Sequence, residues 1–370
     1  MKILLLWLIL STALVFARDN SFVVFVGTYT DSGSRGIYTF RFNANTGSVS
    51  GIELAAVSDN PSFLLPDKNH RFLYVANEIE KFDGKTDGSI SVFGIASQTG
   101  RLTSLQQVSS GGWGPVYLSL DRASRHVLAA NYGAGSIAVL PIERDGRLGR
   151  LTAGVQHSGS KTPRPHAIET SKNDRFLLVP DLGLNKIYSY RYDAQAGSLV
   201  AGITPTVTLP PNTGPRHLAM SPSGKFVYVA NETASSVTVY SFDQETGLLQ
   251  EQQTVSTLPT DSKIENTAAE IALDRTGNFL YVSNRGEDTI AMFGVDQKTG
   301  KLSFRERYSS GGKTPRTFAI DPTGQWMFVA NQGTNAITLF RRDTKTGRLA
   351  ATSKALTVAA PAHLVFVPVE

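Results

Sequence analysis

Residues 214–247 read GPRHLAMSPSGKFVYVANETASSVTVYSFDQETG. The segment holds a proline with an apolar run, a Ser-Pro-Ser-Gly turn, an aromatic-rich run that ends in asparagine, a Ser/Thr/Val run and a Thr-Gly turn. β-Branched and aromatic residues alternate within short runs that are bounded by turn residues, which favours strands over helices. The segment therefore predicts a series of short antiparallel strands.

The same phrase recurs along the whole chain at intervals of roughly fifty residues. Its aromatic-rich run occurs at Phe22 to Thr28 as a degenerate copy, and then at Phe72 to Asn77, Val127 to Asn131, Phe176 to Asp181, Phe226 to Asn231, Phe279 to Asn284 and Trp326 to Asn331. Repeats of this length with about four strands are typical of propeller blades, which hide their edges by closing into a ring. We predict an all-β fold, a seven-bladed β-propeller of four-stranded antiparallel blades. An open β-solenoid and a pair of β-sandwiches are the alternatives.

The two ends of the chain hold complementary parts of one repeat. Pro361 to Phe366 matches the first strand of a unit, as in Pro215 to Met220, whereas the N-terminal unit lacks that strand. We therefore expect the C-terminal strand to complete the N-terminal blade and close the ring. Neither alternative fold needs such half-repeats.

The N-terminus has the pattern of an export signal. Lys2 precedes an apolar stretch from Ile3 to Phe16, and the small residue Ala17 follows. The stretch is shorter than the ~20 residues that span a bilayer. We predict a signal peptide at residues 1–17, cleavage after Ala17, and one propeller domain over residues 18–370 that is periplasmic or secreted and not inserted in the membrane. The chain has no cysteine, but a domain of this size can rest on its core without disulfides.

The charge pattern argues against nucleic-acid binding. The net charge is +5 and the pI is about 9.3, but lysine and arginine are interspersed and form no basic run. A mild positive bias is more consistent with a small anionic ligand.

Alignment of the repeats singles out polar residues at two positions. At the start of the innermost strand, and one residue later, stand His166, Arg216, His217, Glu270 and Arg316. After the second strand stand Glu78, Glu232, Arg285 and Gln332, and Asp181 replaces the usual asparagine of its repeat. Antiparallel neighbours bring the start of one strand beside the end of the next, so we expect these residues to converge at one mouth of the central channel. Ion pairs and hydrogen bonds between blades are the structural alternative.

These side chains suggest the chemistry of the mouth. Guanidinium groups bind anions, and histidine or glutamate can transfer a proton. The chain has no Gly-x-Ser-x-Gly elbow, His-Glu-x-x-His, P-loop or dinucleotide motif, so covalent serine chemistry is poorly supported and no cofactor is predicted. We also expect no metal, because no ligand spacing requires one and the neighbouring arginines would oppose it.

The motifs together resemble the seven-bladed lactonase family, which contains the bacterial propeller-type 6-phosphogluconolactonases and the fungal 3-carboxy-cis,cis-muconate lactonizing enzymes. The resemblance spans essentially the whole predicted mature chain and is carried by VGTYT (Val26 to Thr30), PHA (Pro165 to Ala167), GPRH (Gly214 to His217), VANE (Val229 to Glu232), AAEI (Ala268 to Ile271), SNRG (Ser283 to Gly286) and TPR-FAIDPTG (Thr314 to Gly324). It implies an active site of His166, Arg216, Glu232 and Arg285. The repeat comparison selects the same four residues.

The leading hypothesis is a metal-independent hydrolase of a sugar-acid lactone, with or without a phosphate. Glu232 or His166 would be the general base, and since a carboxylate flanked by arginines is a weak base, His166 is favoured. Arg216 and Arg285 would hold the substrate anion and the developing oxyanion. The other substrate-binding residues are expected to be His217, Glu270, Arg316, Asp181, Glu78 and Gln332. The 6-phosphogluconolactonases of this family act on a cytoplasmic sugar phosphate, whereas this chain has a predicted export signal. The resemblance therefore supports the fold more than the substrate. A carboxymuconate-type cycloisomerase and a non-catalytic binding propeller are the alternatives.

Overall fold

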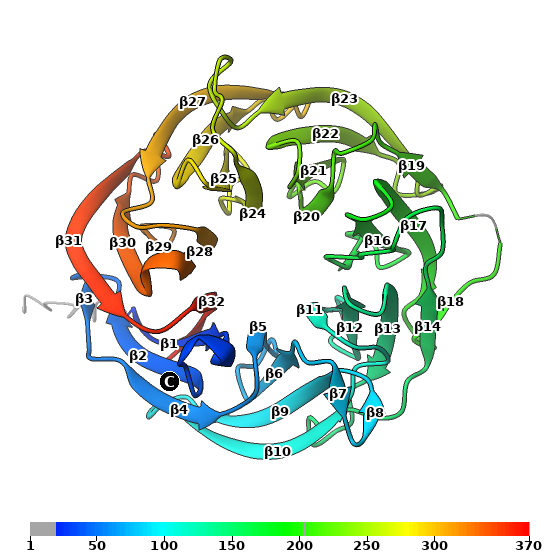
Figure 1. The fold of residues 1–370 in the computed structure, drawn as a ribbon, viewed down its shortest axis with the longest axis horizontal. Helices are drawn as coiled ribbons and strands as arrows, with labels where there is room; N and C mark the ends of the chain where they lie inside the picture. Colours follow the sequence, from blue (N-terminus) through cyan, green and yellow to red (C-terminus); the bar gives the residue numbers. More distant parts are fainter. Residues whose placement is uncertain (1–19, 203, 370) are drawn as a thin grey trace, which may run out of the picture.

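The computed structural model describes residues 20–202 and 204–369, so the predicted signal peptide lies outside the described residues. Seven antiparallel sheets are arranged radially around a central axis (Figure 1), which confirms the predicted seven-bladed propeller. The innermost strands of blades 2 to 7 and then blade 1 are β5 (Pro61–Pro66), β11 (Pro115–Leu120), β15 (Glu169–Thr170), β20 (Pro215–Met220), β24 (Thr267–Leu273), β28 (Pro315–Ile320) and β32 (Pro361–Pro368).

The other strands follow outward in each blade. The second strands of blades 1 to 7 are β1 (Ser21–Thr28), β6 (Phe72–Asn77), β12 (His126–Asn131), β16 (Phe176–Asp181), β21 (Phe226–Asn231), β25 (Phe279–Arg285) and β29 (Trp326–Asn331). The third strands are β2 (Gly36–Asn43), β9 (Ser89–Ala96), β13 (Ser136–Pro141), β17 (Lys186–Asp193), β22 (Ser236–Phe242), β26 (Thr289–Val295) and β30 (Ala336–Arg342). The outer strands are β4 (Glu53–Val57), β10 (Arg101–Ser109), β14 (Ala153–Gln156), β19 (Thr206–Thr208), β23 (Leu249–Ser256), β27 (Leu302–Ser309) and β31 (Leu349–Thr357).

Short elements decorate this frame. A two-residue strand precedes the outer strand in two blades, a small hairpin follows β6, and two 3-10 turns follow β1 and β29. They are β3 (Ser48–Val49), β18 (Ser198–Leu199), β7 (Lys81–Phe82), β8 (Lys85–Thr86), η1 (Thr30–Ser32) and η2 (Gln332–Thr334). The repeat did not predict the β7–β8 hairpin, because it is an insertion confined to one blade.

The ring closes as the half-repeats predict. Strand β32 pairs antiparallel with β1, with Phe22 opposite Pro368 and Gly27 opposite His363. The last strand of the chain thus forms the inner edge of the blade that begins the chain (Figure 1).

Apolar side chains fill the space between neighbouring blades. The Phe42 ring of blade 1, for example, lies edge-on to Phe328 of blade 7 at 4.8 Å between centroids. The Thr-Gly turns extend this packing. Gly247 has φ +77° and lies directly against the Phe176 ring of the preceding blade. A side chain there would meet both an unfavourable backbone conformation and the ring, which explains why a glycine ends each unit.

A β-bulge near the start of the inner strands positions the candidate site. The pairing register shifts between Pro215 and Leu218 in β20, and between Ala268 and Ile271 in β24. Successive side chains of a regular strand point to opposite faces, but a bulge re-aims them and is common beside active sites. Two consecutive residues of β20, Arg216 and His217, consequently both take part in the cluster at the end of the axis.

Candidate active site

Two arginines and one glutamate form the centre of the cluster. Glu232 follows the end of β21, and its Oε2 lies 2.9 Å from Nε of Arg216 in β20. The same oxygen lies 2.9 Å from Nη2 of Arg285 at the end of β25, in the next blade. Burial, with the nearby positive charge of Arg285, lowers the pKa of Arg216 to about 10, so its guanidinium stays charged at neutral pH. Glu232 therefore holds two cationic groups side by side.

Two histidines adjoin this centre. The rings of His166 and His217 are 5.1 Å apart and meet edge to face, and Nε2 of His217 lies 3.2 Å from Nη1 of Arg216. Burial and the positive charge of Arg216 hold the pKa of both histidines well below the ordinary value of 6.5. Both imidazoles are therefore neutral at pH 7. Nδ1 of His166 is buried and has no hydrogen-bond partner among the described residues.

A third arginine lies with the first two blades. The Arg316 guanidinium of β28 stacks 4.9 Å over the Tyr29 ring, and Nη2 is 4.0 Å from Oε2 of Glu78. The Tyr29 hydroxyl donates to the same oxygen at 2.6 Å. The positive charge of Arg316 also contributes to the low pKa of His166, which places the two groups within electrostatic reach of one another.

Glu270 contacts the cluster from β24. Its Oε1 lies 3.2 Å from Nδ1 of His217, and Oε2 accepts a hydrogen bond from the Thr317 hydroxyl at 3.0 Å. Of the ten residues selected from the repeat, eight thus meet at one end of the inner strands: His166, Arg216, His217, Glu232, Glu270, Arg285, Arg316 and Glu78.

Asp181, which the repeat also selects, takes part in a different set of contacts. Asp181 is fully buried, where Oδ2 accepts from Nδ1 of His157 at 2.7 Å and Oδ1 accepts from the amides of Arg164 and Leu184 at 2.9 Å each. Gln332 begins η2, and its backbone amide donates to the Thr314 carbonyl at 3.0 Å; its part in substrate binding stays a prediction. Asp181 departs from asparagine because three donors converge on it, and asparagine has only one acceptor oxygen. The departure of Asp181 from the repeat therefore reflects a structural role in binding these buried donors.

Asp181→Asn should therefore reduce stability and leave substrate affinity intact. The amide nitrogen of asparagine would face a donor in a dry site, which we expect to lower the free energy of unfolding by about 1–3 kcal/mol. Urea unfolding measures this change, with the exposed Asp261→Asn as the matched control. A raised KM at unchanged stability would instead show that Asp181 contacts the substrate.

Several residues of the site carry no charge, so charged departures from the repeat do not reveal them. Tyr29 and Thr317 contact Glu78 and Glu270 as described above, and the Tyr132 ring lies 5.3 Å from that of His166. The Arg164 guanidinium also lies over the Tyr132 ring, 4.7 Å from its centroid. Tyr29, Tyr132 and Thr317 do stand in the two selected repeat positions, so their aromatic or hydroxyl character was the available signal.

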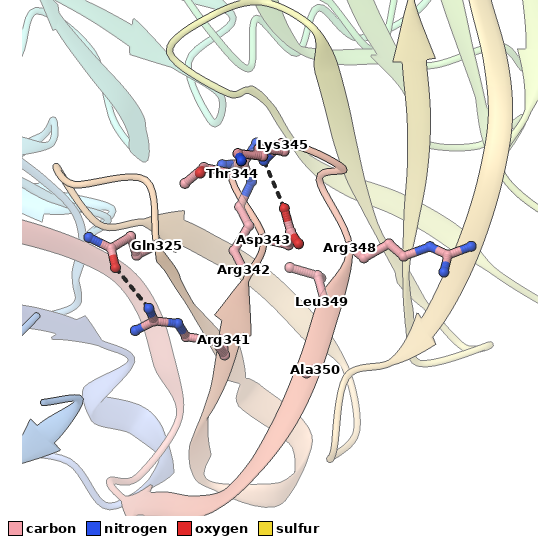
Figure 2. Close-up of a pocket in the computed structure, with 9 residues that line it drawn as sticks. All are labelled: Gln325, Arg341, Arg342, Asp343, Thr344, Lys345, Arg348, Leu349 and Ala350. Carbon is pink, nitrogen blue, oxygen red and sulfur yellow. Dashed lines mark hydrogen bonds between the residues drawn. The ribbon is translucent and has the colours of Figure 1, made fainter. Parts of the chain in front are cut away.

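A surface groove of about 660 Å³ lies away from this cluster, at the β30–β31 turn (Figure 2). Arg341 there donates to the Gln325 side chain at 2.9 Å, and Asp343 accepts from the Lys345 amide at 2.8 Å. Arg342 is bound to buried Asp274 at 3.0 Å. These polar groups stabilise a turn and its neighbours, so the arrangement of histidine, arginine and glutamate at the axis is the better candidate for chemistry.

Two further observations concern the described residues alone. Within residues 20–202 and 204–369, no helix is long and apolar enough to cross a membrane. In the same part of the chain, no three histidine, aspartate or glutamate side chains are grouped so that they could hold a metal ion.

A closed propeller with histidines, arginines and glutamates clustered at the axis defines the class of protein: a β-propeller with an enzyme-like polar site on its inner strands. The family model described as "Lactonase, 7-bladed beta-propeller" matches residues 23–366. The chain therefore belongs to the seven-bladed β-propeller lactonase family, and the resemblance seen in the sequence is confirmed.

Named relatives agree with this assignment. The 6-phosphogluconolactonase of Bacillus subtilis (strain 168) is 34% identical over 305 residues, which cover 81% of this chain and 85% of that protein. The 6-phosphogluconolactonase of Formosa agariphila is 29% identical over 80% of this chain and 85% of its own length. Among solved structures, the periplasmic gluconolactonase of Pseudomonas aeruginosa has a TM-score of 0.88 and 34% identity, and the match covers 95% of this chain and 100% of that one.

Proposed function

We propose that this protein hydrolyses a sugar-acid lactone by attack of water, with His166 as the general base. The observation that carries the proposal is a neutral, buried histidine beside the Arg216–Glu232–Arg285 cluster. The relatives named for 6-phosphogluconolactone and gluconolactone hydrolysis support this substrate class. A lactone of an aldonic acid, with or without a phosphate, is the substrate we expect.

The choice of His166 over Glu232 as the base rests on their partners. Glu232 is bound to two guanidinium groups at 2.9 Å each, and taking up a proton would forfeit both ion pairs. His166 is neutral at pH 7, and its Nδ1 has no partner among the described residues. A neutral imidazole of low pKa can accept a proton from water as the C–O bond forms.

The reaction then follows with atoms and charges in balance. Water loses a proton to His166 while its oxygen bonds to the lactone carbonyl carbon, and negative charge develops on the carbonyl oxygen. Arg216 and Arg285 are the groups proposed to stabilise that oxyanion. Collapse of the intermediate breaks the ring C–O bond, the leaving alkoxide takes the proton from His166, and the carboxylic acid ionises and releases one proton.

A metal is not required by this scheme. The charges of Arg216 and Arg316 act on His166 and would repel a cation, and Arg216 with Arg285 already supplies positive charge to the oxyanion. Export also belongs to the proposal: the predicted signal peptide, together with a structural relative named as periplasmic, supports a location in the periplasm or outside the cell.

The test is turnover of a panel of aldonolactones and their phosphates by residues 18–370. Proton release, followed at constant pH and corrected for spontaneous hydrolysis, should show catalysis with at least one member, unchanged after treatment with a chelator. The product should be heavier than the lactone by one water. Absence of turnover across the panel would contradict the proposal. Cyclisation of an unsaturated dicarboxylate without change in mass would then favour a cycloisomerase, and binding alone a non-catalytic propeller.

A further inference from the structure

Residues of three neighbouring blades form a continuous hydrogen-bonded chain that starts at Arg216, one of the proposed oxyanion donors. Nη1 of Arg216 in blade 5 contacts Nε2 of His217 at 3.2 Å. Nδ1 of His217 contacts Oε1 of Glu270 in blade 6, also at 3.2 Å. Oε2 of Glu270 accepts from the Thr317 hydroxyl of blade 7 at 3.0 Å. The chain thus begins at a proposed catalytic group and ends in the wall of the ring.

The donors and acceptors of this chain allow one protonation pattern. Arginine can only donate a hydrogen bond, so Nε2 of His217 is the acceptor for as long as this contact holds. The low pKa of His217 keeps the ring neutral, and a neutral imidazole carries its single proton on the other nitrogen. Nδ1 is therefore the protonated atom, and it donates to Glu270.

The Glu270 carboxylate is itself held in place from several sides. Besides His217 and Thr317, its Oε1 accepts from the backbone amide of Ile271 at 3.1 Å. The backbone amide of Glu270 in turn donates to the Ser283 hydroxyl at 3.0 Å. A carboxylate with donors on both oxygens has little freedom to turn toward a ligand.

The surroundings of His217 also argue against direct substrate contact. Its side chain is only 5% exposed, and the Tyr117 ring lies edge-on at 5.0 Å. The Tyr117 ring in turn lies 4.4 Å from the Phe63 ring, and His363 stacks on Phe63 with 3.9 Å between ring centroids. These aromatic rings pack along the inner strands and confine the imidazole between them and Arg216.

The other contacts of Arg216 show how this hydrogen-bonded chain orients the guanidinium group. Its Nη1 also donates to the Ala269 carbonyl at 2.9 Å, one residue before Glu270, while Nε faces Glu232. With Nε2 of His217 as a third partner, the plane of the guanidinium is fixed. A donor that is already oriented stabilises an oxyanion without reorganising during the reaction.

We propose that Glu270 is a positioning residue: by fixing the Nδ1-protonated tautomer of His217, it orients Arg216 for the reaction without touching the substrate. This inference rests on the proposed function, since it assigns Arg216 a role in that reaction. It replaces the expectation that His217 and Glu270 bind substrate directly.

Glu270→Gln and Glu270→Ala separate the possibilities. Glutamine keeps an oxygen to accept from His217 and an amide that can donate to Thr317, so it should retain at least about a third of kcat. Alanine leaves Nδ1 without an acceptor, and we expect kcat to fall about 10- to 100-fold with KM changed less than about twofold. The exposed Glu143→Ala is the control and should match the wild type.

A measurement without substrate tests the same point independently of activity. In protein labelled with ¹⁵N-histidine, the His217 signals, assigned by comparison with His217→Gln, should show a protonated Nδ1 and an unprotonated Nε2. Glu270→Gln should keep this pattern, and Glu270→Ala should lose it. This result would support the tautomer assignment even if no lactone were turned over, which separates it from failure of the proposed function.

Other outcomes would overturn the proposal. The first is a protonated Nε2 of His217 in the wild type. The second is a Glu270→Gln variant whose kcat is as low as that of Glu270→Ala. The third is a raised KM at unchanged kcat in Glu270→Ala. Circular dichroism and the unfolding midpoint confirm that each variant is folded before it is compared.

Discussion

Arg216→Ala is expected to lower kcat/KM for the lactone substrate by about 10²- to 10³-fold, the effect of removing one oriented oxyanion donor. Arg216 is only 2% exposed and joins Glu232, His217 and the Ala269 carbonyl. Of the three arginines described in the site, Arg216 has the most contacts, since Arg285 faces Glu232 and Arg316 faces Tyr29 and Glu78. The loss should therefore exceed that of any other single arginine.

The design of this experiment must separate catalysis from folding. Arg341→Ala removes the same side chain from the outer groove (Figure 2), where it donates a hydrogen bond to Gln325, and should keep wild-type kcat/KM. Arg216→Lys keeps the charge but loses the planar array of donors, so we expect activity between wild type and alanine. A folded Arg216→Ala variant with nearly full activity would remove Arg216 from the mechanism.

The fold could be predicted almost completely, because seven copies of one unit give seven independent readings of the same strand pattern. The complementary ends, Pro361 to Phe366 and the N-terminal unit, even predicted the closure that β32 and β1 make. What the repeat could not show is the β7–β8 hairpin, since a feature of one blade has no second copy for comparison.

The site could be predicted only as a set of positions. Departures from the repeat identified eight residues that do meet, but they could not distinguish Asp181, whose departure serves three buried donors. Nor could they show that a bulge lets Arg216 and His217 act together, because strict alternation of a strand would place neighbours on opposite faces. Which group contacts which depends on these local distortions and not on the residue types alone.

The second large effect is expected at His166. His166→Gln removes the proposed base while keeping a polar side chain of similar reach, and kcat should fall about 10²- to 10⁴-fold. Ring contacts to Tyr132 and His217 hold the imidazole in place, and we do not expect a bound water to reproduce this geometry. His70→Gln, at the opposite end of its blade, is the matched exchange and should leave kcat unchanged.

The pH profile decides between His166 and Glu232 as the base. Burial and the charge of Arg216 lower the pKa of His166 well below 6.5, so the basic form persists as the pH falls through 6.5. Wild-type kcat/KM should accordingly stay flat from pH 8 to 6.5 and decline only at more acidic pH, as the imidazole becomes protonated. The residual kcat/KM of His166→Gln should no longer decline at acidic pH. If the decline remains in His166→Gln but disappears in Glu232→Gln, then the glutamate is the base, and the two arginines bound to it must release it when substrate binds.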